Sequence, residues 1–154
     1  MGPSGTFTEQ ALLSQPDLAA ADTRPIGSIP DVLDALVAGE VDAGFVPIEN
    51  AIEGAVNVTQ DALTFDLDLK IQREVVLDVQ LDLLAAPGTR LQDIRTVLSF
   101  PVAVAQCRAF LRAHLPQAEV GAATSTADAA RLVSEGGPGL AAIANPLAAR
   151  LYGL

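Results

Sequence analysis

The chain begins with a run of residues suited to binding an anion, Gly2-Pro3-Ser4-Gly5-Thr6-Phe7-Thr8-Glu9. Thr6 and Glu9 have capping-box spacing, which predicts a helix over residues 6–14 behind a glycine-bearing loop. The first turn of a helix presents unpaired backbone N–H groups at the positive end of the helix dipole, where a carboxylate or phosphate binds. An ordinary capped helix accounts for the same spacing and stays open as the alternative.

A second polar group follows an apolar run, Ala43 to Val46, which predicts a buried strand ended by Pro47. Glu49 and Asn50 would then lie at the carboxyl end of that strand, where ligands bind in open α/β sheets. The Asn50 amide can donate and accept hydrogen bonds, whereas an ionised Glu49 can only accept them. A polar turn after a strand is the alternative interpretation.

Two further helix starts in the second half of the chain carry small polar residues. In Ser99-Phe100-Pro101, Ser99 is a candidate N-cap and Pro101 falls in the first turn, where its missing N–H costs little. Gln106 lies about two turns along the same helix, on the face that Ser99 begins. In Thr124-Ser125-Thr126, hydroxyl residues precede a helix, and Asp128 has capping-box spacing from Ser125. Plain helix caps are the alternative at both places.

With the helix that Asn57 would begin, these make four helix starts, two in each half. They would suit a small ligand with two separated anionic groups if they face one cleft in a two-lobed protein. His114 lies near a helix end before Pro116, where a histidine serves better as a cation at the helix C-terminus than as a catalytic base. The sequence contains no Cys/His metal cluster, no Walker loop and no triad-like set.

Short apolar runs alternate with helical stretches, which predicts the α/β fold class. We place the lobe boundary near Arg73, so that residues 1–73 form the first lobe and 74–154 the second. Asn57 is expected to cap its helix, with Gln60 at capping-box distance. The expected helices are 6–14, 29–38, 57–65, 102–115, 127–135 and 146–151, and the expected strands are 43–46, 69–71, 75–85, 96–98 and 140–144.

The formal net charge of −10 argues against a nucleic-acid partner, and it disfavours anionic membrane lipid. No apolar run reaches the ~20 residues that span a bilayer, and the N-terminus does not read as a secretion signal. Cys107 is the only cysteine, so no intramolecular disulfide can form, and we expect a buried apolar thiol. These features predict a cytoplasmic protein.

The motifs quoted above, in this order and spacing, resemble those of the prephenate dehydratases, as do Ala141-Ala142-Ile143-Ala144 and Tyr152-Gly153-Leu154. The resemblance implies two α/β lobes around a cleft, as in type II periplasmic binding proteins. It also implies a lyase that converts prephenate to phenylpyruvate, with loss of water and carbon dioxide, without a cofactor or metal. By the same resemblance, Glu49, Asn50, Ser99 and Gln106 would line the substrate cleft, and Thr6, Ser125 and Thr126 would supply hydrogen-bond donors.

The sequence departs from the family pattern in three respects. Phe100 stands where many members have histidine, and only Met1 precedes the Gly2-Pro3 loop, where the family has an apolar strand. The family's Thr-Arg-Phe segment, which carries the catalytic threonine, is not in this sequence, so the catalytic residue is unknown and we expect little turnover by this chain alone. A non-catalytic anion-binding module or an arogenate dehydratase is the alternative. A fragment, a shortened chain and a non-catalytic descendant all stay open, as does a homo-oligomer.

Overall fold

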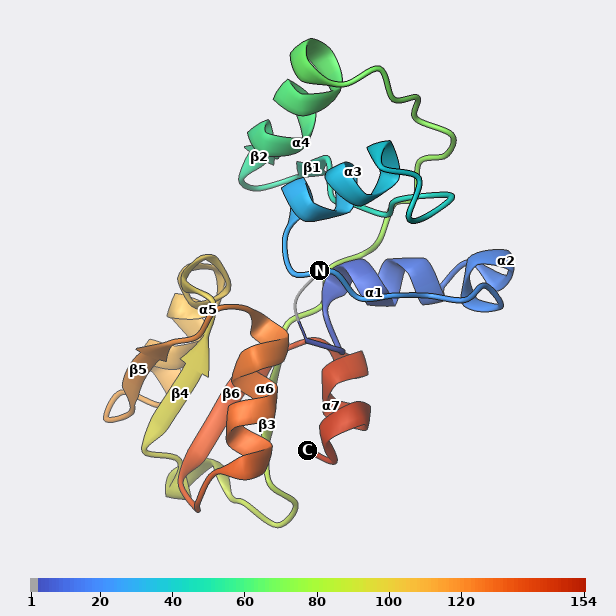
Figure 1. Cartoon of the computed structure of the whole chain (residues 1–154). Coiled ribbons are helices and arrows are strands. Elements are labelled where there is room, and N and C mark those ends of the chain that lie inside the picture. The colour runs from blue at the N-terminus through green and yellow to red at the C-terminus, as the bar shows by residue number, and fades with distance from the viewer. Residues whose placement is uncertain (1–2) are drawn as a thin grey trace. The chain divides into compact units, whose positions relative to one another are not determined.

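The structure is a computed structural model that describes residues 3–154 (Figure 1). These residues form two compact units, one of residues 8–77 and the other of residues 3–7 and 78–154. The chain therefore passes between the units twice, once after Phe7 and once after Leu77. The predicted arrangement of two lobes about one cleft, with a boundary near Arg73, stays a prediction.

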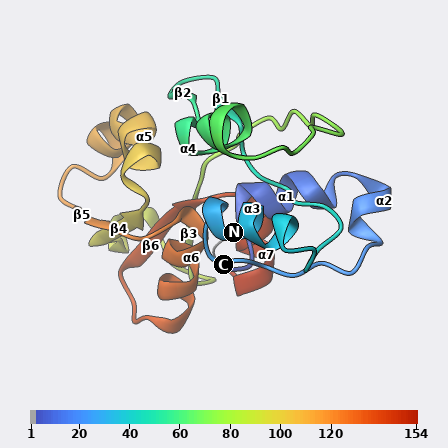
Figure 2. The same ribbon diagram turned by 45° about the horizontal axis from the view of Figure 1, so that its top comes forward.

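The regular structure of the unit of residues 8–77 is mainly helical. Figure 2 shows its short hairpin of β1 and β2 at the start of α4. Ser28 caps α3 by accepting a hydrogen bond from the Asp31 N–H at 3.3 Å. The apolar face of α3 is buried. The elements are α1 (Phe7–Leu13), α2 (Pro16–Ala19), α3 (Ile29–Val37), β1 (Glu49–Asn50), β2 (Gly54–Ala55), and α4 (Asn57–Asp61), which continues as a π-helical turn over Ala62–Asp66.

Three strand predictions in this part of the chain are wrong. Residues 43–46 and 69–71 are irregular, and of the expected strand 75–85 only its end, β3, forms. A strand needs a neighbouring strand to pair with its backbone, and the first two segments have none among the described residues. Large apolar side chains of segments 69–71 and 75–81 are exposed instead, as at Ile71 (65%) and Val76 (84%). The apolar runs led us to predict buried strands, but a strand forms only where its backbone pairs with that of a neighbouring strand.

The other unit is built on a four-stranded sheet in the order β3-β6-β4-β5. Strands β4, β5 and β6 are parallel, and β3 lies antiparallel to β6. The elements are β3 (Asp82–Ala85), a 3-10 turn (Leu91–Asp93), β4 (Thr96–Ser99), α5 (Pro101–His114), β5 (Glu119–Ala122), α6 (Thr126–Glu135), β6 (Leu140–Ala144) and α7 (Pro146–Tyr152). The predicted α/β class is confirmed, and β5 is a strand that the sequence did not predict.

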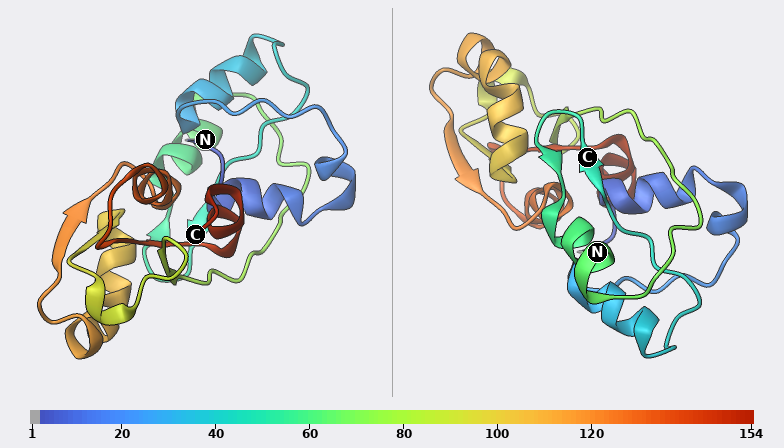
Figure 3. Two further views of the ribbon diagram at one scale, coloured as in Figure 1. Left: turned by 90° about the horizontal axis from the view of Figure 1, so that it is seen from below. Right: turned by 90° about the horizontal axis from the view of Figure 1, so that it is seen from above.

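The core of this unit lies on both faces of β6, whose side chains alternate between them. Ala142 and Ala144 pack with Ala130 and Val133 of α6, and Ala148 of α7 joins the same cluster. Figure 3 shows α5 and α6 on opposite sides of the sheet. On the α5 side, the cluster contains Val97, Ala103, Leu111, Ala141 and Ile143. The small side chains of Ala142 and Ala144 let α6 pack closely on the sheet.

Within residues 3–154, none of the helices combines the length and the apolar character needed to cross a bilayer.

Candidate functional site

The carboxyl ends of the three parallel strands bring several of the predicted site residues to one end of the sheet. Ser99 ends β4, Thr124 and Ser125 follow β5, and Asn145 follows β6. Ligands of open α/β sheets bind outside the carboxyl ends of parallel strands. This end of the sheet is therefore the candidate site of the unit that contains residues 78–154.

Ser99 is fully buried, and its Oγ donates a hydrogen bond to the Ile143 carbonyl at 2.7 Å. The prediction that Ser99 caps α5 is wrong, because Ser99 is still part of β4 and its side chain bonds across to β6. Phe100 occupies the N-cap position without a side-chain bond, and its ring is 43% exposed. Ser99 thus holds two strands together, and its hydroxyl hydrogen is already engaged.

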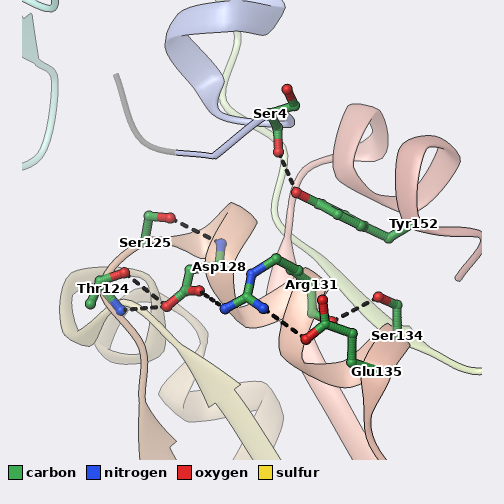
Figure 4. Close-up of polar contacts among 8 residues, drawn as sticks. All are labelled: Ser4, Thr124, Ser125, Asp128, Arg131, Ser134, Glu135 and Tyr152. Atoms are coloured by element: carbon green, nitrogen blue, oxygen red, sulfur yellow. Dashed lines mark hydrogen bonds and ion pairs between the residues drawn. The ribbon is translucent and has the colours of Figure 1, made fainter. Parts of the chain in front are cut away.

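The predicted N-cap at Ser125 is confirmed. Its Oγ accepts a hydrogen bond from the Asp128 N–H at 3.0 Å, which leaves the hydroxyl hydrogen of Ser125 available for donation (Figure 4). In a standard capping box, the Asp128 carboxylate would accept a hydrogen bond from the backbone N–H of Ser125, which it does not do here. It accepts instead from the Thr124 N–H at 3.2 Å and from the Thr124 hydroxyl at 2.8 Å. Thr126 is the first residue of α6 and is half-buried.

Arg131 completes this arrangement from one turn along α6. Its guanidinium donates to Asp128 at 2.8 Å and to Glu135 at 2.7 Å (Figure 4). The pKa of Asp128 lies below its usual range, mainly because Arg131 donates a hydrogen bond to the carboxylate and secondly because Thr124 does so. The charged form of Asp128 therefore fixes the Thr124 side chain, whereas the hydroxyl hydrogen of Ser125 has no acceptor among the described residues.

Thr6 lies in the short N-terminal segment that belongs to the same unit as α6 and α7, not to the unit of residues 8–77. It is buried and immediately precedes α1, close to the helix start that the sequence predicts. Two residues before it, the Ser4 carbonyl accepts a hydrogen bond from the Tyr152 hydroxyl at 2.8 Å.

Glu49 and Asn50 form β1 of the small hairpin in the unit of residues 8–77, where Glu49 pairs with Ala55 and Asn50 with Gly54. The Asn50 Oδ1 accepts hydrogen bonds from the N–H groups of Ile52 at 2.9 Å and Glu53 at 3.1 Å. The amide nitrogen of Asn50 donates to no described residue, so both of its N–H groups are available. Glu49 is exposed.

The hairpin is held to α4 by two side chains, one that the sequence analysis did not single out, Thr59, and one for which it predicted a different role, Gln60. Thr59 is fully buried and donates to the Pro47 carbonyl at 2.8 Å, and Gln60 donates to Ile48 at 3.3 Å. The prediction that Asn57 caps α4 is wrong, because the helix already includes Asn57 and Val56 is its N-cap residue. Gln60 reaches back to the hairpin rather than to its own helix start.

The remaining residues singled out by the sequence lie on α5. Gln106 is exposed on this helix, and the His114 ring lies 4.6 Å from that of Phe110 near the helix end. Cys107 is half-buried, and burial raises the pKa of its thiol, which disfavours the reactive thiolate.

Asn145 is a residue that the sequence did not single out. It is fully buried, and its Oδ1 accepts from the Ala148 N–H at 2.7 Å, capping α7, while its Nδ2 has no partner among the described residues. Asparagine directly before a proline at the first position of a helix is a recognisable cap signal that would have identified it.

Comparison with known proteins identifies relatives along the whole sequence. A family model described as prephenate dehydratase matches residues 1–154. A prephenate dehydratase of Mycobacterium leprae is 45% identical over 162 residues, which cover 100% of this chain and 50% of the relative. The chain thus spans about half the length of the curated relatives it matches.

Two solved structures show the same fold. A prephenate dehydratase of Arthrobacter aurescens, crystallised in complex with L-Phe, is 40% identical with a TM-score of 0.89, over 98% of this chain and 50% of that one. A protein described as a novel type of quorum-quenching acylase is 27% identical with a TM-score of 0.67, over 99% of this chain and 54% of that one. Prephenate dehydratases have a fold like that of periplasmic binding proteins, which confirms the predicted fold class. Because the fold also carries another activity, function has to be argued from the residues of the site.

Proposed function

The chain belongs to the prephenate dehydratase family, and from that premise we propose that it binds prephenate for decarboxylating dehydration to phenylpyruvate, a lyase reaction of L-phenylalanine biosynthesis in the cytoplasm. The residues that we assign to ligand contact are Thr6, Asn50, Gln106, Ser125 and Thr126 as donors, and Glu49 as an acceptor for the ring hydroxyl of the ligand rather than for its carboxylates. Ser99 supports them by holding β4 to β6.

One observation carries the proposal. At both Asn50 and Ser125 the acceptor oxygen is bonded to backbone N–H groups, so that the polar hydrogens are what each residue has left to offer. Available donors, rather than acceptors, are what a dicarboxylate requires, and a bond to an ionised group contributes about 1.5–3 kcal/mol. Local donors are also necessary because the chain as a whole is acidic, with a net charge of −10.

The chemistry of prephenate explains what such donors would do. Prephenate carries two carboxylates and a ring hydroxyl, which must leave as water after protonation by an acid. Loss of the ring carboxylate as carbon dioxide supplies the electron pair that expels the hydroxyl, and the ring becomes aromatic. Aromatisation drives the reaction, so the work of the assigned residues is to hold and orient the dianion.

Calorimetric titration of the chain with prephenate tests the proposal, with succinate as a dicarboxylate that lacks the ring. We expect prephenate to bind more tightly than succinate, and an absence of prephenate binding would refute the proposal. Phenylpyruvate formation, followed by its absorbance, then separates a dehydratase from a binding module that lacks the chemistry. Tighter binding of arogenate than of prephenate would instead identify an arogenate-specific site.

A further inference from the structure

A hydrogen bond joins the two ends of the described chain. The Tyr152 hydroxyl of α7 donates to the Ser4 carbonyl at 2.8 Å, across 148 positions of sequence (Figure 4). Ser4 is part of the glycine-bearing loop that the sequence associates with ligand binding, and Tyr152 is part of a motif with no function assigned above. Ser4 and Tyr152 belong to the same structural unit, which contains residues 3–7 and 78–154.

Close packing accompanies this hydrogen bond. Gly5 has φ +96°, a backbone conformation that favours glycine, and a Cβ built at Gly5 would lie 3.2 Å from the Ala148 Cα and 3.5 Å from the Tyr152 Cε2. The loop backbone therefore lies directly against α7. Any side chain at position 5 would push the loop away from the helix.

The helix that holds the loop is itself well fixed. Asn145 caps its first turn, and Ala148 is fully buried in the cluster formed with α6 and β6. At its other end Gly153 takes a left-handed conformation, and the Leu154 N–H closes the helix on the Ala149 carbonyl at 3.0 Å. Tyr152 thus projects from a helix that is capped at both ends, whereas the loop before α1 forms only a turn.

We propose that Tyr152 is a positioning residue: its hydroxyl holds the Ser4–Thr6 loop against α7 and so fixes the Thr6 side chain for ligand binding. The inference rests on the proposed function. It makes Thr6 a partner of Ser125 within one unit, although the sequence places Thr6 in the other lobe. Tyr152 acts through the loop and does not touch the ligand itself.

The test compares Tyr152→Phe, which keeps the ring and removes the hydroxyl, with Ser134→Ala. The control removes another hydroxyl-to-carbonyl bond of the same unit, from Ser134 to Arg131 at 2.7 Å. Hydrogen exchange of the Gly5 and Thr6 amides, thermal melting and prephenate titration are measured for both. In Tyr152→Phe we expect faster exchange at both amides and about threefold to tenfold weaker prephenate binding, the range set by one hydrogen bond. Ser134→Ala should have a melting temperature similar to that of Tyr152→Phe but should bind prephenate with wild-type affinity.

A double variant shows whether Tyr152 acts through Thr6. If it does, Tyr152→Phe should cost little further affinity in a Thr6→Val background, whereas a fully additive loss would place its action elsewhere and overturn the proposal. Unchanged exchange of Gly5 and Thr6, or faster exchange with unchanged affinity, would also overturn it. If wild type binds no prephenate, the proposed function fails, and the exchange data alone then decide whether Tyr152 fixes the loop.

Discussion

The oxygen of the Asn50 side-chain amide holds the hairpin turn, and we propose that its nitrogen donates to the ligand. The variant Asn50→Asp separates these two roles. Aspartate keeps the oxygen that accepts from Ile52 and Glu53, so the turn of the hairpin should persist. It replaces the N–H donors with a negative charge, so prephenate affinity should fall at least tenfold, the equivalent of losing about 1.5–3 kcal/mol. Titration calorimetry and thermal melts of the two proteins measure both effects.

Asn50→Ala is the matched comparison, because it removes the acceptor as well as the donors. It should lower stability by about 1 kcal/mol or less, the usual scale at an accessible polar position. If Asn50→Asp binds prephenate as wild type does while Asn50→Ala melts lower, Asn50 serves the turn only.

Ser125 allows the same separation in the other unit. Aspartate is as good an N-cap as serine, so Ser125→Asp should melt close to wild type, whereas Ser125→Ala should lose about 1 kcal/mol of stability. Both variants lack the hydroxyl hydrogen, and both should bind prephenate more weakly, the aspartate more so because of its charge. Urea unfolding and titration of the pair are the measurements. Weak binding by the alanine variant alone would mean that the cap, not the donor, supports the ligand.

Residue types and spacing identified polar residues but not the partners of their atoms. The cap at Ser125 follows from local spacing alone, and it is confirmed. Ser99 and Asn57 have equally suitable types, but their partners depend on where β4 and α4 begin and end, which tertiary structure decides. Thr59 was missed because its acceptor, the Pro47 carbonyl, is twelve residues away in sequence.

At the scale of elements, sequence prediction succeeded where apolar residues face a core. The helix α6 repeats buried positions at helical spacing, and β6 is an unbroken apolar run between two helices. It failed for β5, whose residues Glu119 to Ala122 are mostly exposed at the edge of the sheet and are a strand only by pairing with β4. The opposite error occurs at segments 43–46 and 69–71, whose apolar residues predicted strands although both segments are irregular.

The start of α6 should respond to acid through Asp128. Its pKa is lowered in the folded state, mainly by Arg131, so the charged form stabilises the fold. That contribution is complete above the unfolded pKa near 3.8 and is lost as the pH falls through the lower folded pKa. Asp128→Asn should therefore be less stable than wild type by about 1–2 kcal/mol at neutral pH, given hydrogen bonds to a charged group. The difference should shrink as the pH falls below 4 or so.

Urea unfolding of both proteins between pH 3 and pH 8 measures this change. Asp93→Asn is the control in the same unit, because Asp93 also pairs with an arginine, Arg90, but the two side chains are 43% and 70% exposed. An exposed pair contributes little, so the control should show a smaller difference. A difference between wild type and Asp128→Asn that stays constant with pH would exclude the charge of Asp128 as its cause.

At the scale of the whole molecule, the two units differ in how much core each contains. Both hydrophobic clusters belong to the unit with the four-stranded sheet, with Val97 and Ala141 at 0% exposure. The unit of residues 8–77 buries one face of α3 and little else, and its hairpin has two residues in each strand. Burial of apolar surface is the main source of local stability, so the two units should open with different free energies.

Hydrogen exchange followed by mass spectrometry tests this difference and the predicted shared cleft together. Without ligand, amides of β4 and β6 should exchange slowest, and those of β1, β2 and residues 67–77 fastest. Prephenate should slow exchange around Asn50 and around Ser125 in the same titration if both units hold one ligand, because binding stabilises whatever it contacts. Succinate at equal concentration is the control for general ionic effects. Protection confined to the sheet unit would mean that Asn50 does not take part in binding, and the two-lobed cleft would be wrong for this chain.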